Sequence, residues 1–121
     1  MIWTSCYSNM LFLPKSIVAI SISRFPPKNW KGPVILALAP FQEILLKYKE
    51  DHDEKWYVEA FSQQLALLDP QIAANSIHSK YGDKVALLCY EKPNQFCHRH
   101  LVAEWLSKAG IRCEEYPCNG L

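Results

Sequence analysis

The segment that most constrains the fold is Val85 to Tyr90, which reads VALLCY. It is a nearly continuous apolar run, and such runs are typical of strands that are covered on both faces, as in parallel sheets. A loop with Pro93 and Asn94 follows, and residues 95–109 show helical periodicity that ends at Gly110, a good C-cap. The run therefore predicts a buried parallel strand that leads through a loop into a helix.

Other segments extend this pattern along the chain. Further strands are predicted at residues 2–7, 16–23 and 111–116, and residues 33–39 fit either a strand or the lead into a helix. Three helices are predicted. The first spans residues 41–50, the second begins after a cap at Asp51 or Asp53, and the third begins after a cap at Asp69. The alternation predicts an α/β fold, a three-layer Rossmann-like domain with a small, mainly parallel sheet, and 121 residues predict a single domain.

The charges of the chain nearly balance, but they are unevenly distributed. The net charge of +1, from 13 basic and 12 acidic residues, does not by itself predict nucleic-acid binding. Residues 1–42 hold four basic residues and no acid, whereas residues 43–69 hold three lysines and seven acids. The basic first third suits an anionic ligand, although ordinary solvated charges are the favoured explanation.

The cysteines and the apolar runs bear on the cellular compartment. Five cysteines are an odd number, and their spacing shows no paired framework. The first residues lack the basic start and apolar stretch of a signal peptide, and the longest apolar run, Val34 to Ala39, is far shorter than a membrane span. We therefore expect free thiols and a cytoplasmic protein with no membrane partner.

Polar side chains follow the ends of the predicted strands, where α/β sheets usually bind ligands. Ser8 and Asn9 follow the first strand, and Ser23 and Arg24 end the second. We expect these four residues to bind a ligand at one pocket rim that also includes residues 89–99, with Arg24 on a phosphate group. The alternative for Arg24 is a loop arginine that stacks on a neighbouring aromatic ring.

The start of the predicted helix at 95–109 is a second candidate for anion binding. With Asn94 as N-cap, Gln95, Phe96 and Cys97 occupy the first three helical positions, whose amides have no partner within the helix. The positive end of a helix attracts anions, and Arg99 adds a fork of donors that fits phosphate or carboxylate. Arg99 is therefore predicted to bind the ligand.

Three residues around this helix start are predicted to be catalytic. Glu91 directly follows the apolar strand and can act as a general acid or base, or accept from a ribose hydroxyl; alternatively it is a solvated acid that pairs with Lys92. Cys97 and His98 are predicted to point inward, where a helix start favours the thiolate. The alternative for Cys97 is a small buried hydrophobic residue, and the alternative for His98 is a hydrogen-bonded histidine of the core. His100 is predicted to lie on the surface beside Glu104.

A metal site is the remaining alternative for this stretch. Cys89, Cys97 and His98 can supply three ligands, and Cys113 or Cys118 a fourth. Their spacing lacks the close C-x-x-C pair of common zinc sites, so no metal is predicted. No other cofactor is predicted either.

Several short elements together resemble the family catalogued as domain of unknown function 488. They are TSCYSN, SISRFPP, LALAP and LLCYEKPNQFCHRHLVAEWL, followed by G and CEE. The resemblance is closest to the short, single-domain members, and longer members often have aspartate where this chain has Ser23. It implies a Rossmann-like domain of bacteria or their phages. It also implies that the family's motif positions are occupied by Arg24, Cys89, Glu91, Cys97, His98 and Arg99.

Two classes of function follow from these residues. The first is a hydrolase or transferase that acts on a nucleotide, a nucleoside or a nucleic-acid end, with phosphate held by the arginines and proton transfer at Glu91. The second is a non-enzymatic protein that binds a nucleotide-like ligand or a protein partner. Turnover separates the two, because an enzyme yields a product and a binding protein returns its ligand unchanged.

Overall fold

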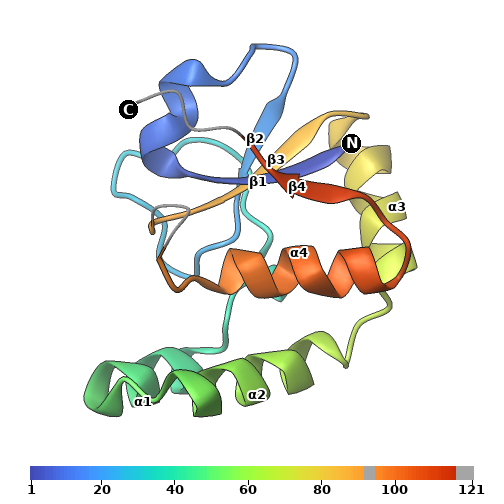
Figure 1. Ribbon diagram of the computed structural model, residues 1–121. Helices are drawn as coiled ribbons and strands as arrows, with labels where there is room; N and C mark the ends of the chain where they lie inside the picture. Colours follow the sequence, from blue (N-terminus) through green and yellow to red (C-terminus); the bar gives the residue numbers. More distant parts are fainter. Residues whose placement is uncertain (92–94, 117–121) are drawn as a thin grey trace.

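Four parallel strands form one sheet in the computed structural model, which describes residues 1–91 and 95–116 (Figure 1). Across the sheet their order is β2 (Val18–Ser21), β3 (Val85–Cys89), β1 (Ile2–Cys6) and β4 (Cys113–Glu115). Every residue of β3 is buried between its neighbours, as its apolar sequence predicts. In the register of the sheet, Ile2 pairs with both Val85 and Cys113.

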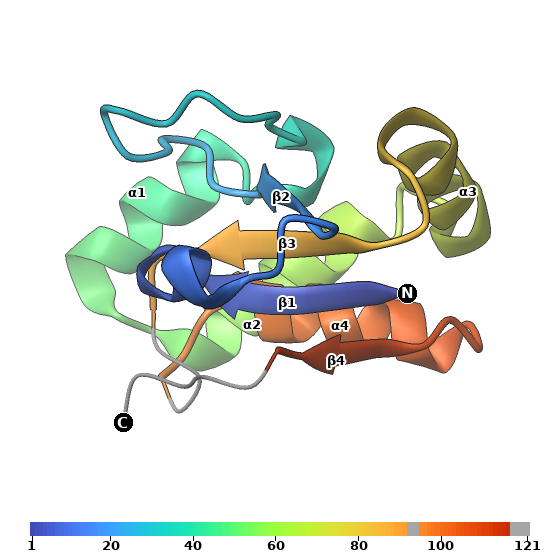
Figure 2. The ribbon, with the colours of Figure 1, turned by 90° about the horizontal axis from the view of Figure 1, so that it is seen from above.

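The helices are stacked against the sheet in two tiers (Figure 1). They are α1 (Gln42–Asp51), α2 (Glu54–Leu65), α3 (Pro70–Tyr81) and α4 (His98–Lys108), with the short 3-10 helices η1 (Tyr7–Phe12) and η2 (Leu36–Leu38). Helix α4 packs on β1, β3 and β4, whereas α2 packs on α4 and α1 on α2. Seen from above, α1 lies near the carboxyl ends of the strands and α3 at their opposite ends (Figure 2).

The two faces of the sheet are covered differently. The face toward the α-helices carries the main core, in which Val85 and Leu87 pack with Phe61 and Val102. The other face holds a smaller cluster around Ala86 and Leu88, packed against aromatic side chains of β1, η1 and the loops. The prediction of a small Rossmann-like fold with a parallel sheet is thus confirmed, and η1 and loops make the layer on the second face in place of α-helices.

Several predicted boundaries differ from those observed. The ambiguous segment 33–39 contributes one bridge, Val34 to Ser21, and then the 3-10 helix η2. Helix α4 starts at His98 because Cys97 is extended and acts as N-cap, so the start predicted at Gln95 is wrong. The predicted N-cap Asn94 lies outside the described residues.

The predicted caps of the two middle helices are confirmed. Asp53 accepts a hydrogen bond from the amide of Trp56, and Asp69 accepts from the amides of Gln71 and Ile72. These carboxylates satisfy donors that have no partner within the helix and lie at its positive end.

Replacing Asp69 by alanine is expected to lower the free energy of unfolding by about 1 kcal/mol, because two amides of α3 lose their acceptor. Urea denaturation of the variant measures the change. Asp83→Ala is the matched control, since Asp83 is an exposed acid of the following turn that caps no helix. Equal effects of the two substitutions would contradict the capping role.

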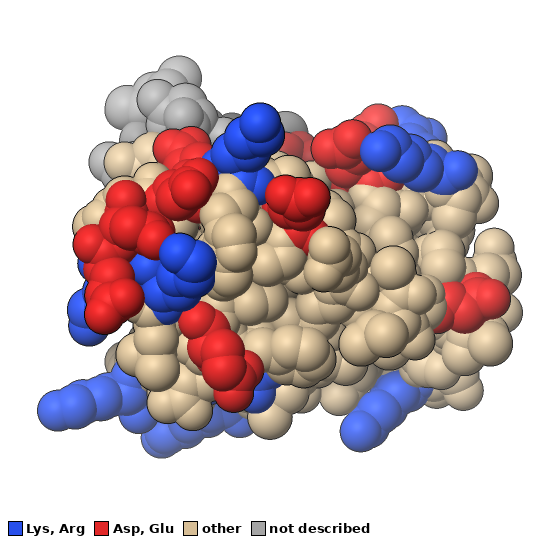
Figure 3. All heavy atoms as spheres, turned by 90° about the horizontal axis from the view of Figure 1, so that it is seen from below, with Lys and Arg blue, Asp and Glu red and all other residues tan. Residues whose placement is uncertain are grey.

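The acidic middle third of the chain forms the outer tier of helices. Figure 3 shows the molecule from below, with acidic side chains gathered toward one side of this face, basic ones among them and a mainly uncharged centre. This face therefore offers no continuous basic surface for a nucleic-acid backbone. None of the helices in the described ranges combines the length and the apolar character that a membrane crossing requires.

Candidate functional site

A cavity of about 190 Å³ opens at the carboxyl ends of β2 and β3. This is the edge of a parallel sheet at which ligands usually bind. The lining residues come from both strand ends, from α1 and α2, and from the start of α4. They are Ser23, Arg24, Phe25, Pro40, Leu45, Tyr48, Tyr57, Cys89, Tyr90, Glu91, Phe96 and His98.

Arg24 brings a positive charge to one wall of the cavity. Its Nε donates to the carbonyl of Pro40 at 2.8 Å, and its Nη2 lies 3.3 Å from the carbonyls of Leu36 and Ala39. These contacts fix the direction of the guanidinium, but carbonyl oxygens do not neutralise its charge. The ion pairs among the described residues do not include Arg24, so a bound anion could provide the missing negative charge.

Ser23 lies beside Arg24 in a network of hydroxyl groups. The hydroxyl of Tyr7 donates to Ser23 Oγ at 2.8 Å and lies 2.7 Å from Ser21 Oγ. This network ties the end of β2 to the start of η1. These hydrogen bonds hold Ser23 at the cavity. Its position at the end of a strand predicts this location.

Glu91 is an exposed carboxylate that lines the same cavity. Its charge helps to raise the pKa values of Tyr48, Tyr57 and Tyr90, in each case together with the larger effect of burial. The carboxylate thus lies near three phenol groups that stay protonated, of which Tyr90 donates to the carbonyl of Phe25. Its predicted pairing with Lys92 lies outside the described residues.

Aromatic side chains form a further wall of the cavity. The rings of Tyr57 and Phe96 are 5.0 Å apart and those of Tyr48 and Tyr57 are 5.1 Å apart, both in edge-to-face arrangements. Tyr48 and Phe96 are nearer to parallel, with 33° between their planes. Such a cluster offers flat apolar surface on which a planar ring can pack.

His98 and Cys89 line the cavity, and Cys97 lies next to them outside the lining. Cys97 and His98 both point inward, as predicted, and the Cys97 sulfur is bonded to Cys89 in a disulfide. His98 Nε2 lies 2.6 Å from the carbonyl of Ile22, which can only accept, so Nε2 carries the proton and Nδ1 is unprotonated. Burial lowers the pKa of His98 to about 4, so the imidazole is neutral at pH 7.

The prediction of free thiols is wrong for Cys89 and Cys97, which form the disulfide. It is confirmed for Cys6 and Cys113, and Cys118 lies outside the described residues. Burial raises the pKa of the Cys113 thiol to about 12, so this thiol stays protonated and unreactive. The disulfide joins sequence positions eight residues apart, at the end of β3 and the start of α4.

Arg99 lies behind the cavity and not in its lining. Its side chain is fully buried, and it forms a two-pronged ion pair with Glu115 at 2.9 and 3.1 Å. Its Nη1 donates to the sulfur of Cys89 at 3.1 Å and to the carbonyl of Glu91. The prediction that Arg99 faces an external anion is therefore wrong. All three nitrogens of its guanidinium already donate to acceptors within the protein.

Ser8 and Asn9 are not brought to the cavity either. Both lie on η1, where Ser8 Oγ contacts the Cys6 sulfur at 3.1 Å and the buried Asn9 donates to Ser5 Oγ at 3.0 Å. The strand end of β1 therefore leads away from the cavity that β2 and β3 share. His100 is half-buried and not on the surface as predicted, and Glu104 pairs with Lys108 instead.

The aromatic wall is the part of the site that sequence reasoning missed. Tyr57 follows the apolar period of its helix together with Phe61, and it both belongs to the main core and lines the cavity. Periodicity identifies the buried side of a helix but does not say whether that side meets other helices or a cavity. No signal in the sequence brings α1 and α2 across the strand ends.

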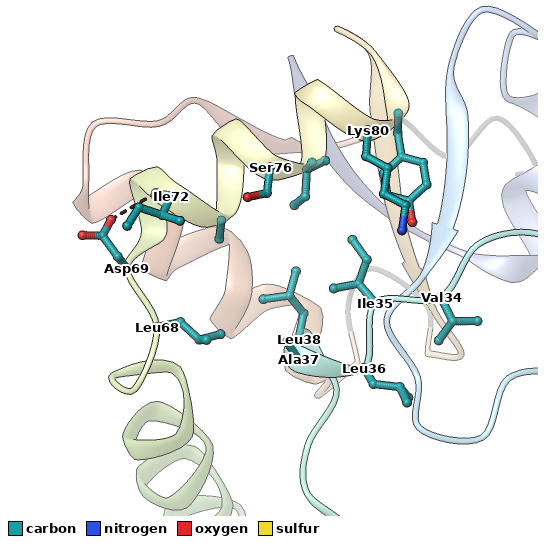
Figure 4. Close-up of a pocket in the computed structure, with 13 residues that line it drawn as sticks. Val34, Ile35, Leu36, Ala37, Leu38, Leu68, Asp69, Ile72, Ser76 and Lys80 are labelled. Atoms are coloured by element: carbon teal, nitrogen blue, oxygen red, sulfur yellow. Dashed lines mark hydrogen bonds between the residues drawn. The ribbon is translucent and has the colours of Figure 1, made fainter.

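A larger cavity of about 460 Å³ lies between residues 34–38 and α3 (Figure 4). Its labelled lining is mainly aliphatic, and the side chains of Ile35 and Leu38 point toward α3. Asp69 is already engaged as the cap of α3. The other polar residues of this cavity, Ser76, Lys80 and Tyr81, all belong to α3, whereas the polar groups of the site at the strand ends come from several elements.

Comparison with known proteins identifies a family but no named relative. A family model described as the active DUF488-N3 subclade, DUF488-N3a, matches residues 11–110, which include all the cavity-lining residues. No curated protein and no solved structure matches the chain.

Proposed function

The chain belongs to the DUF488 family, and from this premise we propose that the cavity at the ends of β2 and β3 binds a nucleoside or nucleotide and that the protein acts on it as a hydrolase or transferase. The ligand is either free or the end of a nucleic-acid chain. Its base packs on the aromatic wall, its phosphate lies at Arg24, and a ribose hydroxyl lies at Glu91.

The observation that carries this proposal is the meeting of three kinds of group around one cavity. Arg24 supplies a cation without an ionic partner among the described residues, and Glu91 supplies an exposed carboxylate. Tyr48, Tyr57 and Phe96 supply flat ring surface. A nucleotide combines an anion, hydroxyl groups and a planar ring, whereas a purely apolar ligand would leave both charges unused.

The size of the cavity limits what it can enclose. Pockets that bury a drug-sized ligand have volumes of about 300–1,000 Å³, and this cavity has about 190 Å³. It therefore suits one ring with its attached group, and the remainder of a larger ligand extends into solvent. A dinucleotide would be held by one half only.

The proposed chemistry is proton transfer at the ligand. Glu91 is the candidate general base, because its carboxylate is exposed at the cavity and is not part of an ion pair among the described residues. Arg24 stabilises negative charge that develops on a phosphate or leaving group. The description of the matching subclade as active favours an enzyme over a binding protein.

Thermal unfolding with a panel of nucleosides, nucleotides and short oligonucleotides tests the proposal. A ligand at one hundred times its Kd is expected to stabilise the protein by about 2.7 kcal/mol. Arg24→Gln is expected to weaken binding of the phosphorylated ligands by about tenfold or more, since a charge-assisted hydrogen bond contributes about 1.5–3 kcal/mol. Lys28→Gln, in an exposed loop outside the cavity, is expected to leave the affinity unchanged.

A second substitution separates binding from turnover. Glu91→Gln keeps the shape of the side chain and removes its charge, so ligand should still bind while product formation falls by at least about a hundredfold. The control is Glu59→Gln, on the exposed side of α2. Binding without any product in the wild type would identify a binding protein. No stabilisation by any member of the panel would contradict the nucleotide pocket.

A further inference from the structure

Three side chains that bind transition metals well lie close together beside the cavity. The ligating atoms of Cys89, Cys97 and His98 all lie within 4.8 Å of one another, and all three residues are buried. They belong to the end of β3 and the start of α4, so two elements of regular structure position them. Thiolate and imidazole are the ligands that zinc prefers in proteins.

The orientation of His98 suits a ligand. Its Nε2–H donates to the backbone carbonyl of Ile22 at 2.6 Å, which leaves the unprotonated Nδ1 toward the cysteines. Nδ1 lies 3.9 Å from the Cys97 sulfur. A hydrogen bond from the second ring nitrogen to a carbonyl is the arrangement that fixes the tautomer of metal-bound histidines.

The spacing leaves room for an ion when the sulfur–sulfur bond is absent. The Cα atoms of Cys89 and Cys97 are 7.5 Å apart, beyond the span of about 4.4–6.8 Å that is usual for disulfides. Metal bonds of about 2.3 Å to sulfur and about 2.1 Å to nitrogen or oxygen place neighbouring tetrahedral ligands about 3.6 Å apart. The distances of 3.9 Å from Cys97 to His98 and from Cys89 to Glu91 are close to that spacing.

The charges nearby also favour a divalent cation. Arg99 donates to the Cys89 sulfur at 3.1 Å, which supports a thiolate there. The charge of Arg99 is itself offset by Glu115 at 2.9 Å. Two buried thiolates would thus need two further positive charges, and one Zn²⁺ supplies both.

We infer that the reduced protein binds one zinc ion through Cys89 Sγ, Cys97 Sγ and His98 Nδ1, with the fourth position open to the cavity beside Glu91. Three protein ligands and one open position are the pattern of catalytic zinc sites. Metal-bound water at that position would provide the nucleophile for hydrolysis, with Glu91 next to it as base. The oxidised form, with its disulfide, is the metal-free state of the same site.

The two states interconvert by thiol–disulfide exchange. A dithiol reductant supplies two electrons and two protons, the bond between the two sulfurs breaks, and the reductant becomes a disulfide. Zinc then binds the two thiolates and releases the two protons to solvent. In the reverse direction a disulfide oxidant takes up two electrons from the thiolates and two protons from solvent, the bond between Cys89 and Cys97 re-forms, and the ion leaves.

Cobalt and zinc titrations test the inference without any nucleotide, so it can fail independently of the proposed function. The full chain is reduced with a phosphine, stripped with a chelator and titrated anaerobically with Co²⁺. One equivalent is expected to bind, with a thiolate-to-cobalt absorption band that Zn²⁺ abolishes. The oxidised wild type is expected to bind none, a comparison that needs no substitution.

Matched cysteine variants locate the ion. Cys97→Ser is expected to lose the absorption band and the stoichiometric equivalent, whereas Cys113→Ser, which removes a thiol from β4 outside the cluster, retains both. Circular dichroism confirms that each variant is folded. Reduced, folded wild type that binds no more Co²⁺ than the oxidised form would overturn the inference, as would unchanged binding by Cys97→Ser.

Discussion

Replacing Arg99 by alanine is expected to lower the free energy of unfolding by about 3 kcal/mol or more. The fully buried guanidinium joins Glu115 of β4, the Cys89 sulfur and the carbonyl of Glu91. Its removal takes this donor from the Cys89 sulfur and the Glu91 carbonyl, and it leaves the partly buried Glu115 with the hydroxyl of Thr4 but without a cation among the described residues. Urea denaturation, followed by circular dichroism, measures the loss.

Arg112→Ala is the matched control for this substitution. Arg112 also pairs with a glutamate of β4, Glu114, at 3.1 Å, but both side chains are more than half exposed. An exposed pair contributes about 0–1 kcal/mol, so the control should change little. A loss at Arg99 no larger than that at Arg112 would contradict the structural role assigned to the buried guanidinium.

Acidification is expected to destabilise the oxidised, metal-free protein through His98. Burial lowers the pKa of His98 to about 4, and the charges of Arg99 and His100 act in the same direction. The unfolded chain, with an ordinary histidine pKa of about 6.5, takes up the proton first, so stability falls as the pH drops from about 6.5 to about 4. Above pH 6.5 the imidazole is neutral in both states and the effect is absent.

Over that pH range, the protonation of His98 is expected to lower the free energy of unfolding by about 3 kcal/mol. Denaturation of the wild type and of His98→Gln at pH 7 and pH 4.5 measures it, because protonation of the carboxylates affects both proteins alike. The variant should lose markedly less stability on acidification. Parallel pH profiles of the two proteins would contradict a buried, neutral His98.

The sequence was most informative where one physical requirement decides the structure. A run such as VALLCY has to be covered on both faces, and β3 is the buried strand next to the centre of a parallel sheet. Asp53 and Asp69 act as helix caps because a carboxylate before an apolar-periodic segment satisfies free amides. Ser23, Arg24, Glu91 and His98 meet at the strand ends, as the general rule for α/β sheets predicts.

The remaining features depend on tertiary contacts that no local pattern contains. Arg99 faces inward because Glu115, sixteen residues away, reaches it from the neighbouring strand. Cys89 and Cys97 lack the close spacing of a familiar motif, yet the turn from β3 into α4 brings their sulfurs together. The aromatic wall arises because α1 and α2 cross near the strand ends, a placement set by packing between helices.

Mapping of amide chemical shifts by NMR, during titration with a nucleoside monophosphate, tests the central claim most directly. The largest shifts are expected in the segments around the cavity, at residues 22–25, 45–57, 89–91 and 96–98, and Arg24→Gln is expected to reduce them greatly. Shifts centred instead on residues 34–38 and 68–81, around the apolar cavity of Figure 4, would contradict it.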